Sequence, residues 1–237
     1  MPDRRTVRTW AEIDLDALAH NYRLLRGLAP EAKFLGLVKA NAYGHGAVPV
    51  AKKLESLGAD MLAVACLDEA IELRQAGIAL PILCLGQTPP ELAGELLEYD
   101  VTQTVGDLVT GEALSAAAVA AGKTLKIHVK VDTGMGRLGF VWGEDGEAAL
   151  EGAAMDIDAL CALPGLEAEG IFTHFADADG SEAYTRTQMN RFEGVYGKLR
   201  DQGVDFKIYH CAASAAVLNY PWMSVDMIRP GIALYGY

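Results

Sequence analysis

A lysine at the end of an apolar run has the setting that most favours chemistry in this sequence. Lys39 follows the run Phe34–Val38 and opens a segment of small residues that ends at Gly46. In a strand, Leu35, Leu37 and Lys39 would lie on one side. At the C-terminal end of a barrel strand such a lysine would face the active-site mouth, where desolvation lowers the pKa of the amine and allows it to form a Schiff base. A solvated loop lysine is the alternative.

A second candidate is the arginine in a glycine-rich segment. Residues 134–139 have the spacing G-x-G-x-x-G and follow an apolar run. That pattern can bind a dinucleotide pyrophosphate at a helix N-terminus. The following residues, 140–143, do not continue as a helix, so we do not expect a dinucleotide site. Arg137 is instead a candidate cation for an anionic group of a substrate or cofactor.

Small residues after the last two apolar runs could bind a phosphate. Ser214 follows the run Phe206–Tyr209, and Gly231 and Ile232 follow the run Val225–Ile228. Barrels often bind phosphate in the loops after strands seven and eight. Backbone N–H groups can approach an anion closely there, above all at Gly231, which has no side chain. Taken singly, each residue could equally belong to an ordinary small-residue turn.

Eight short apolar runs would have to position these residues. Several show little alternation of apolar and polar residues, which is typical of strands buried on both faces. We expect strands at Phe34–Val38, Met61–Ala65, Ile82–Leu85, Val101–Val105, Leu125–Val131, Glu169–Thr173, Phe206–Tyr209 and Val225–Ile228.

Helical patterns lie between these runs. One begins after Asp14, which can cap it, and three more end at a glycine: Asp68–Ala76, Asp107–Ala121 and Glu182–Gln202. Strands alternating with helices predict a (β/α)₈ barrel, with a doubly wound open sheet as the alternative.

Composition limits the class of protein. The chain has 237 residues, and 20 Lys+Arg against 32 Asp+Glu give a formal charge of −12. This acidic balance argues against nucleic acid and against anionic membranes as partners. No targeting or membrane-spanning segment is expected. The four cysteines have no metal-ligand spacing, so we expect reduced thiols, a cytoplasmic location and no metal.

Several segments together resemble alanine racemases, a family of pyridoxal-phosphate enzymes. The resemblance extends over nearly the whole chain and keeps the order of the motifs. The matching segments are Trp10–Asp14, Val38–Gly46, Lys130–Gly139, Thr173–Ala176, His210–Ala216 and Asp226–Gly236.

The resemblance implies a cofactor, pyridoxal 5′-phosphate, and a role for each matching residue. Lys39 would hold the cofactor and then move a proton at the substrate Cα. Tyr43 would donate its hydroxyl to the cofactor phosphate. Arg137 would contact the cofactor's phenolic oxygen and lie near the substrate carboxylate, and His174 would lie against the pyridine ring.

Three further roles follow from the same resemblance. Arg229 would face the pyridine nitrogen, and because a guanidinium only donates, that nitrogen would stay unprotonated and transamination would be limited. Ser214, Gly231 and Ile232 would bind the phosphate. Lys130 matches a lysine that is carbamylated in many family members; a plain lysine paired with an acid such as Asp132 is the alternative.

The sequence departs from the family in two respects. Ala213 stands where the family usually has asparagine. Family members also carry a β-rich domain after the barrel, which supplies the second base, a tyrosine, to the partner subunit's site. We therefore expect a strand segment at 1–13 and the barrel at 14–237, with the C-terminal domain absent.

The expected function is that of an isomerase interconverting L-alanine and D-alanine, which supplies D-alanine for peptidoglycan. The full-length protein would be a homodimer, and the chain as given would racemise very slowly. The alternatives are a single-domain carrier of the cofactor without racemase activity, and a racemase for serine or a broader set of substrates. A metal-dependent hydrolase using His174, Asp177 and Asp226 has no support from metal-ligand spacing.

Overall fold

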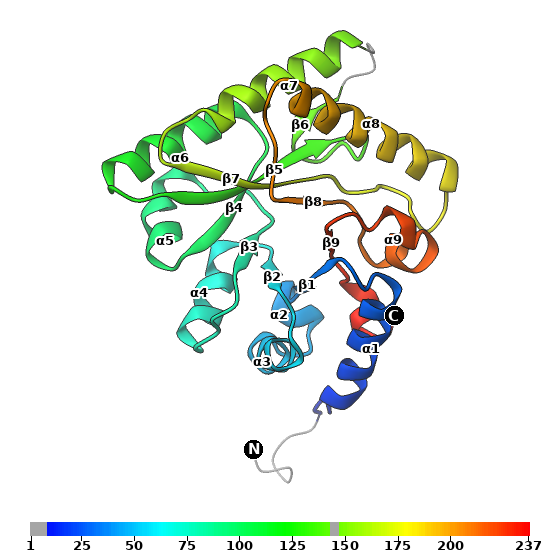
Figure 1. Cartoon of the computed structure of the whole chain (residues 1–237). Helices are drawn as coiled ribbons and strands as arrows, with labels where there is room; N and C mark the ends of the chain where they lie inside the picture. Colours follow the sequence, from blue (N-terminus) through cyan, green and yellow to red (C-terminus); the bar gives the residue numbers. More distant parts are fainter. Residues whose placement is uncertain (1–8, 143–146) are drawn as a thin grey trace.

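The computed structural model of the chain describes residues 9–142 and 147–237 (Figure 1). The α-helices are α1 (Leu15–Leu28), α2 (Lys39–Tyr43), α3 (Ala47–Leu57), α4 (Leu67–Gln75), α5 (Ala93–Glu98), α6 (Leu108–Ala120), α7 (Glu147–Cys161), α8 (Glu182–Asp201) and α9 (Ser214–Asn219). Short 3₁₀ helices are η1 (Pro90–Leu92), η2 (Pro221–Met223) and η3 (Ile232–Tyr235). Within the described residues, none of the helices is long and apolar enough to cross a membrane.

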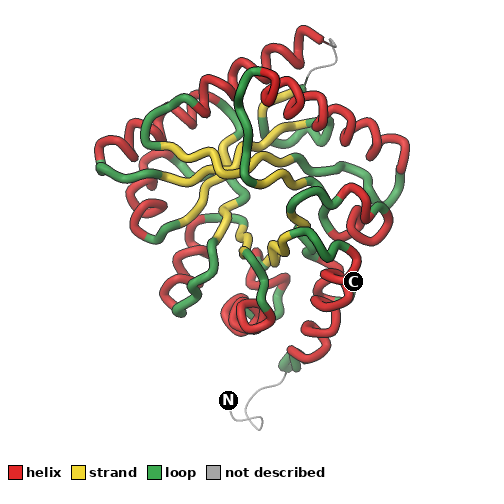
Figure 2. Tube along the Cα trace, in the orientation of Figure 1, coloured by secondary structure: helices red, strands yellow, loops and turns green. Residues whose placement is uncertain are grey.

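The strands are β1 (Lys33–Leu37), β2 (Met61–Val64), β3 (Ile82–Cys84), β4 (Val101–Val105), β5 (Leu125–Asp132), β6 (Phe140–Val141), β7 (Leu166–Phe172), β8 (Ile208–His210) and β9 (Met227–Ile228). They pair in parallel in the order β8-β7-β5-β4-β3-β2-β1-β9, and β6 pairs with β5 outside this path. Figure 2 shows the strands at the centre and the helices around them.

The two ends of this sheet meet, so the strands form a nearly closed barrel. Between β8 and β9, the N–H of Arg229 donates to the carbonyl oxygen of Ala212 over 2.9 Å, and the N–H of Asp226 donates to that of Tyr209 over 3.2 Å. A single bridge also joins Ala213 and Arg229. The predicted (β/α)₈ barrel is thereby confirmed, and the open sheet is not the fold.

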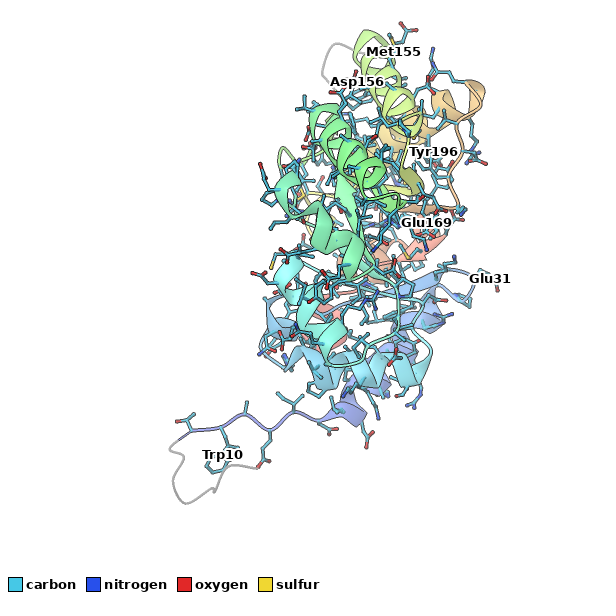
Figure 3. The ribbon with its side chains drawn as sticks, turned by 90° about the vertical axis from the view of Figure 1, so that its left-hand side faces the viewer. Trp10, Glu31, Met155, Asp156, Glu169 and Tyr196 are labelled. Atoms are coloured by element: carbon cyan, nitrogen blue, oxygen red, sulfur yellow. The ribbon has the colours of Figure 1, made fainter. Side chains whose placement is uncertain are left out.

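All eight predicted strands occur, with ends that move by up to three residues. The short strand β6 was not expected. Helix α1 begins after Asp14 as predicted, because the Asp14 carboxylate accepts the N–H groups of Asp16 and Ala17. Residues 9–13 are in no strand, and residues 1–8 lie outside the described residues, so the N-terminal strand stays a prediction. Trp10 extends away from the barrel (Figure 3).

The inside of the barrel is divided into two halves of different polarity. One half is apolar and consists of Leu35, Leu37, Met61, Ala63, Leu83, Ile208 and Met227. The other half contains four buried polar side chains from β5, β8 and the end of β9: His128, Lys130, His210 and Arg229. The larger apolar cluster of the protein lies between the barrel and its helices.

A bulge interrupts the pairing of β5 with β7. Ile127 pairs with Ala168, whereas the next residue, His128, pairs with Gly170. Glu169 is therefore the unpaired residue of the bulge. Bulges turn side chains in new directions, and they are rare between parallel strands. Figure 3 shows Glu169 on the same side of the molecule as Glu31, the side from which the strands start.

Candidate functional site

Two adjoining cavities lie at the C-terminal ends of the barrel strands. Their volumes are about 220 and 290 Å³. Residues that line both include Lys39, His174, Ala213 and Arg229. The first cavity is also lined by Lys130 and Arg137, and the second by Tyr43, Ser214, Gly231 and Ile232. The structure thus brings all nine predicted site residues together in one place; their individual roles stay predictions.

Lys39 leads into an unusual turn. Residues 40–43 all have φ between +51° and +54°, so that four successive residues other than glycine are left-handed. Such a conformation costs roughly 1–2 kcal/mol per residue. Hydrogen bonds offset this cost: the N–H of Ala42 donates to the carbonyl oxygen of Val38 over 2.8 Å, and the N–H of Ala40 donates to the Glu69 carboxylate over 2.6 Å. The segment of small residues after Lys39 thus begins with a left-handed helical turn built from residues with side chains.

The surroundings of the Lys39 amine lower its pKa and so shift it toward its neutral form. The side chain is half-buried, and burial lowers the pKa of the amine, as does the positive charge of Arg137. The carboxylate of Glu69 acts in the opposite direction. Among the described residues, no carboxylate lies within ion-pair distance of Lys39 Nζ. A neutral amine is the nucleophilic form of lysine, and it can also accept a proton.

The Asp132 carboxylate shapes the loop that carries Arg137. Asp132 Oδ1 accepts the N–H groups of Gly134, Met135 and Gly136 over 2.8 to 3.1 Å, and Oδ2 accepts that of Arg137 over 2.9 Å. Burial alone would raise the pKa of Asp132, but these four donors hold the pKa below its ordinary value. The Arg137 side chain lies exposed at the rim of the first cavity.

Lys130 is the most strongly perturbed amine of the site. Its side chain is 3% exposed, and Nζ donates to the carbonyl oxygens of Val131, over 2.8 Å, and Leu138, over 3.3 Å. Burial lowers the pKa of Lys130 to about 7. In the described part of the chain Lys130 forms no ion pair with Asp132, whose oxygens are held by backbone N–H groups. The alternative of a plain Lys130–Asp132 pair is therefore not what this structure contains.

Arg229 is held from two sides. Its Nη1 lies 2.9 Å from Nδ1 of His210, and its Nη2 donates to the carbonyl oxygens of Thr173 and Cys211 over 2.7 and 3.0 Å. Burial lowers the pKa of Arg229 to about 10, so the guanidinium is still charged at neutral pH. Burial, followed by the charge of Arg229, lowers the pKa of His174 to about 3, so this imidazole is neutral.

Tyr43, Ser214 and Gly231 come together at the end of the second cavity. Ser214 Oγ accepts the N–H of Gly231 over 2.9 Å and that of Ala233 over 3.2 Å. A Cβ at position 231 would lie only 2.5 Å from the Tyr43 hydroxyl oxygen, so the lack of a side chain at Gly231 leaves room for this hydroxyl. The close approach of the Gly231 N–H to a phosphate stays a prediction. The ring of Tyr235 lies 5.0 Å from that of Tyr43, and its hydroxyl donates to the Leu37 carbonyl oxygen over 2.6 Å. Sequence reasoning missed Tyr235.

It also missed two buried histidines, His128 and His210. Period two places His128 on the same side of its strand as Lys130, which was a usable signal. The metal-dependent hydrolase has no support here either. Asp226 precedes β9, whereas His174 follows β7, so the two lie at opposite ends of the barrel. Across residues 9–142 and 147–237, no group of three His, Cys, Asp or Glu side chains could hold a metal ion.

Comparisons with known proteins agree on one family. The sequence profile of the family described as "Alanine racemase, N-terminal domain" matches residues 13–237. The alanine racemase of Desulforamulus reducens is 48% identical over 96% of this chain and 60% of its own length. That of Clostridium tetani is 44% identical over 96% of this chain and 57% of its own length.

Solved structures give the same result. The alanine racemase of Clostridium difficile 630 in complex with cycloserine superposes with a TM-score of 0.92 and 43% identity, covering 98% of this chain and 62% of that one. A histidine racemase from Leuconostoc mesenteroides superposes with a TM-score of 0.84 and 28% identity, covering 94% and 58%. The chain thus spans about 60% of the length of the curated relatives it matches, and their names do not favour the cofactor carrier.

Proposed function

Since this chain belongs to the family of alanine racemase N-terminal domains, we propose that it is the cofactor-binding barrel of an enzyme that interconverts L-alanine and D-alanine. The observation that carries the proposal is the half-buried Lys39 amine, which lines a cavity at the C-terminal ends of the strands together with three other basic side chains: Lys130, Arg137 and Arg229. The proposal includes pyridoxal phosphate as cofactor, a cytoplasmic homodimer, and D-alanine supply for peptidoglycan.

The donors of the site fit pyridoxal phosphate. At the end of the second cavity, the hydroxyls of Tyr43 and Ser214 and the backbone N–H groups of Gly231 and Ile232 would hold the phosphate. Two of the N–H groups there, from Gly231 and Ala233, already converge on one oxygen, that of Ser214. This arrangement of donors around an oxygen suits a phosphate group.

The chain's own residues would position the reacting atoms. Bound pyridoxal phosphate withdraws electrons from the substrate Cα, which makes the Cα proton acidic. Lys39 would be the attachment residue, and its neutral amine would remove or return that proton on one face. Arg137, at the rim, would bind the substrate carboxylate. Because racemisation needs a second base on the other face, we place that base in the part of the relatives that this chain does not span.

Arg229 would face the pyridine nitrogen. A guanidinium has no acceptor atom, so its N–H can only donate to that nitrogen, which then stays unprotonated. His174 would lie against the ring as a neutral imidazole, because burial lowers its pKa to about 3. Neither residue adds a proton to the ring, and this restricts the reaction to proton transfer at Cα.

Lys130 would be carbamylated. Its buried amine has a pKa of about 7 and is therefore partly neutral at physiological pH. The nitrogen lone pair forms a bond to the carbon of CO₂, a proton leaves to solvent, and the product is an anion close to Arg137 and Arg229. In [¹³C]bicarbonate the chain should give a carbamate ¹³C signal that Lys130→Met removes and Lys126→Met, on the exposed side of β5, does not.

The cofactor proposal is tested by attachment. The chain is mixed with pyridoxal phosphate, reduced with borohydride, digested, and the labelled peptide is identified. Lys39 should carry the label, and Lys39→Ala should remove it while Lys52→Ala, on helix α3, does not. Labelling of other lysines in the absence of label at Lys39 would reject the site. Alanine racemisation is then compared between this chain and one extended to the length of the relatives, at equal cofactor occupancy; the extended chain should be faster.

A further inference from the structure

A line of four polar side chains crosses the inside of the barrel. Arg229 lies at the cavity, His210 and His128 follow, and Glu169 ends the line near the N-terminal ends of the strands. Nη1 of Arg229 is 2.9 Å from Nδ1 of His210, and Nε2 of His210 is 2.8 Å from Nδ1 of His128. Nε2 of His128 is 3.7 Å from Oε2 of Glu169. Both histidines are completely buried.

The chemistry of arginine sets the direction of these contacts. A guanidinium can only donate, so Nδ1 of His210 must accept and carries no proton. The proton of neutral His210 is then on Nε2 and is donated to Nδ1 of His128. By the same reasoning His128 carries its proton on Nε2, which faces Glu169. Every donor in the line therefore points away from the cavity and toward a carboxylate.

This arrangement excludes a charged imidazole. Protonated His210 would place an N–H donor against the donor of Arg229 at 2.9 Å. Burial, followed by the charge of Arg229, lowers the pKa of His210 well below its ordinary value, and burial also lowers the pKa of His128. The charged groups that act on the two imidazoles are Arg229, Lys130, Lys33 and Glu169.

Two features of the backbone indicate that the line is built into the fold. The bulge between β5 and β7 makes Glu169 the unpaired residue next to the pair of His128 and Gly170. A Cβ at Gly170 would lie 2.7 to 2.9 Å from the atoms of the His128 ring, so only glycine leaves room for this imidazole. The His210 ring, in turn, stacks on Phe172 at 4.6 Å with 7° between the planes.

The far end of the line still has an unsatisfied donor. His128 Nε2 is buried and has no hydrogen-bond partner among the described residues, and the Glu169 carboxylate is the acceptor it faces. At the near end, Nη1 and Nη2 of Arg229 are engaged by His210, Thr173 and Cys211. The Nε–H of Arg229 makes no hydrogen bond within the described part of the chain, and Arg229 lines both cavities.

We propose that three side chains are positioning residues for the Arg229 guanidinium: His210, His128 and Glu169. Arg229, His210 and His128 form a one-way hydrogen-bond chain that points at the Glu169 carboxylate, 3.7 Å from His128 Nε2. This arrangement fixes the guanidinium plane and reserves its Nε–H for the cofactor. The inference rests on the proposed function for one point, that Arg229 faces the cofactor. The hydrogen-bond chain itself is a property of the protein without cofactor.

The first test therefore uses the 237-residue chain without cofactor. The chain has five histidines, so ¹⁵N-histidine labelling gives a simple spectrum. Long-range ¹H–¹⁵N correlation should show His128 and His210 neutral, each with its proton on Nε2, from about pH 5 to pH 8, the range in which an imidazole of ordinary pKa changes its charge. A proton on Nδ1 of either residue, or titration of either imidazole within this pH range, would overturn the proposal.

The second test concerns the carboxylate. Glu169→Gln keeps the shape of the side chain and removes its charge, so the resonance of the His128 Nε2 proton should move upfield because the N–H is no longer polarised by a carboxylate 3.7 Å away. Glu167→Gln is the matched control, since Glu167 lies on the same strand and pairs with Lys207. Equal shifts in the two variants, or no shift in Glu169→Gln, would show that Glu169 is not part of the line of polar side chains.

The third test concerns the cofactor. His210→Leu removes both hydrogen bonds, whereas the His210→Gln side chain can accept from Arg229 and donate to His128. The visible absorption of bound pyridoxal phosphate should change in His210→Leu, with affinity weakened on the order of tenfold, and His210→Gln should restore both. The same spectrum and affinity in all three proteins would overturn the positioning role. If the unmodified chain binds no cofactor, the proposed function fails while the first two tests still decide whether the hydrogen-bond chain exists.

Discussion

The backbone N–H of Arg137 points back to the carboxylate of Asp132, 2.9 Å away. Three more N–H groups of the same loop meet that carboxylate. One buried side chain therefore holds the segment that presents Arg137 at the rim of the site, although Asp132 itself lines neither cavity.

Replacement of Asp132 should destabilise the protein and loosen this loop. Asp132→Ala leaves four backbone donors without their acceptor and should lower the free energy of unfolding by about 3 kcal/mol. Asp132→Asn keeps one oxygen and should cost less. Urea unfolding gives the free energy of unfolding of the two variants. Equal losses would contradict the role of the carboxylate, whose Oδ1 accepts three of the N–H groups and whose Oδ2 accepts that of Arg137.

The same residue predicts an acid limit. The pKa of Asp132 is lowered in the folded protein, so its stabilisation is complete above the ordinary value of 3.8 and is lost as the pH falls through the folded-state pKa. The unfolding free energy of the unmodified chain should therefore fall more steeply below about pH 4 than that of Asp132→Asn. Parallel curves for the two proteins would be inconsistent with this prediction.

Lys130 predicts a dependence of the same sign at higher pH. Its pKa falls from an ordinary value of 10.5 to about 7, so between these values the unfolded chain holds a proton that the folded chain does not. Stability should rise with pH through this window, by about 2 kcal/mol from pH 7 to pH 9 in buffer free of CO₂. Lys130→Met should abolish the rise and Lys126→Met should keep it. Urea unfolding at the two pH values is the measurement.

Two glycines should respond to alanine in opposite ways. Gly170→Ala would place a methyl group against the His128 ring and should lower the unfolding free energy by about 1–3 kcal/mol. Gly197, inside helix α8, has open space around its Cβ position, and Gly197→Ala should raise stability by up to about 1 kcal/mol. Thermal unfolding of both variants measures the two changes in stability. Stabilisation by Gly170→Ala would show that the His128 ring can move aside.

Glu69 should support the attachment lysine. Its two carboxylate oxygens accept the N–H groups of Ala40, over 2.6 Å, and Ala65, over 2.7 Å. Glu69→Ala should lower the unfolding free energy by about 2 kcal/mol and weaken cofactor attachment at Lys39. Glu72→Ala, on the exposed side of helix α4, is the control. Unchanged borohydride labelling of Lys39 in Glu69→Ala would show that the turn holds its shape without this cap.

The sequence was sufficient to predict the barrel and the residues that line the candidate site. Lys39, His174 and Arg229 each lie at or just after the end of an apolar run, and parallel barrel strands bring such ends together at one mouth. Gly231 was predicted because its backbone N–H, with no side chain beside it, can approach a phosphate closely. These predictions depend on strand period and connectivity, which are local properties of the chain.

The rest depends on contacts between distant segments. The family resemblance included Lys130 in the site but could not show that Asp132 would be held by its own loop rather than by Lys130. The bulge at Glu169 exists only because β7 pairs with β5, so no local sequence pattern predicts it. Nor does the composition of residues 40–43 favour a left-handed turn; the hydrogen bonds to Val38 and Glu69 impose it.

That turn has a consequence for chirality. Residues 40–43 follow the mirror image of an ordinary helical turn, which suits amino acids of D configuration better than those of L configuration. Ala40 is exposed, so its methyl group has no packing partners to lose. A semisynthetic chain with D-alanine at position 40 would relieve part of the strain in the loop that carries Lys39. In a protein for which we propose the production of D-alanine, that residue would suit the backbone of the candidate active site.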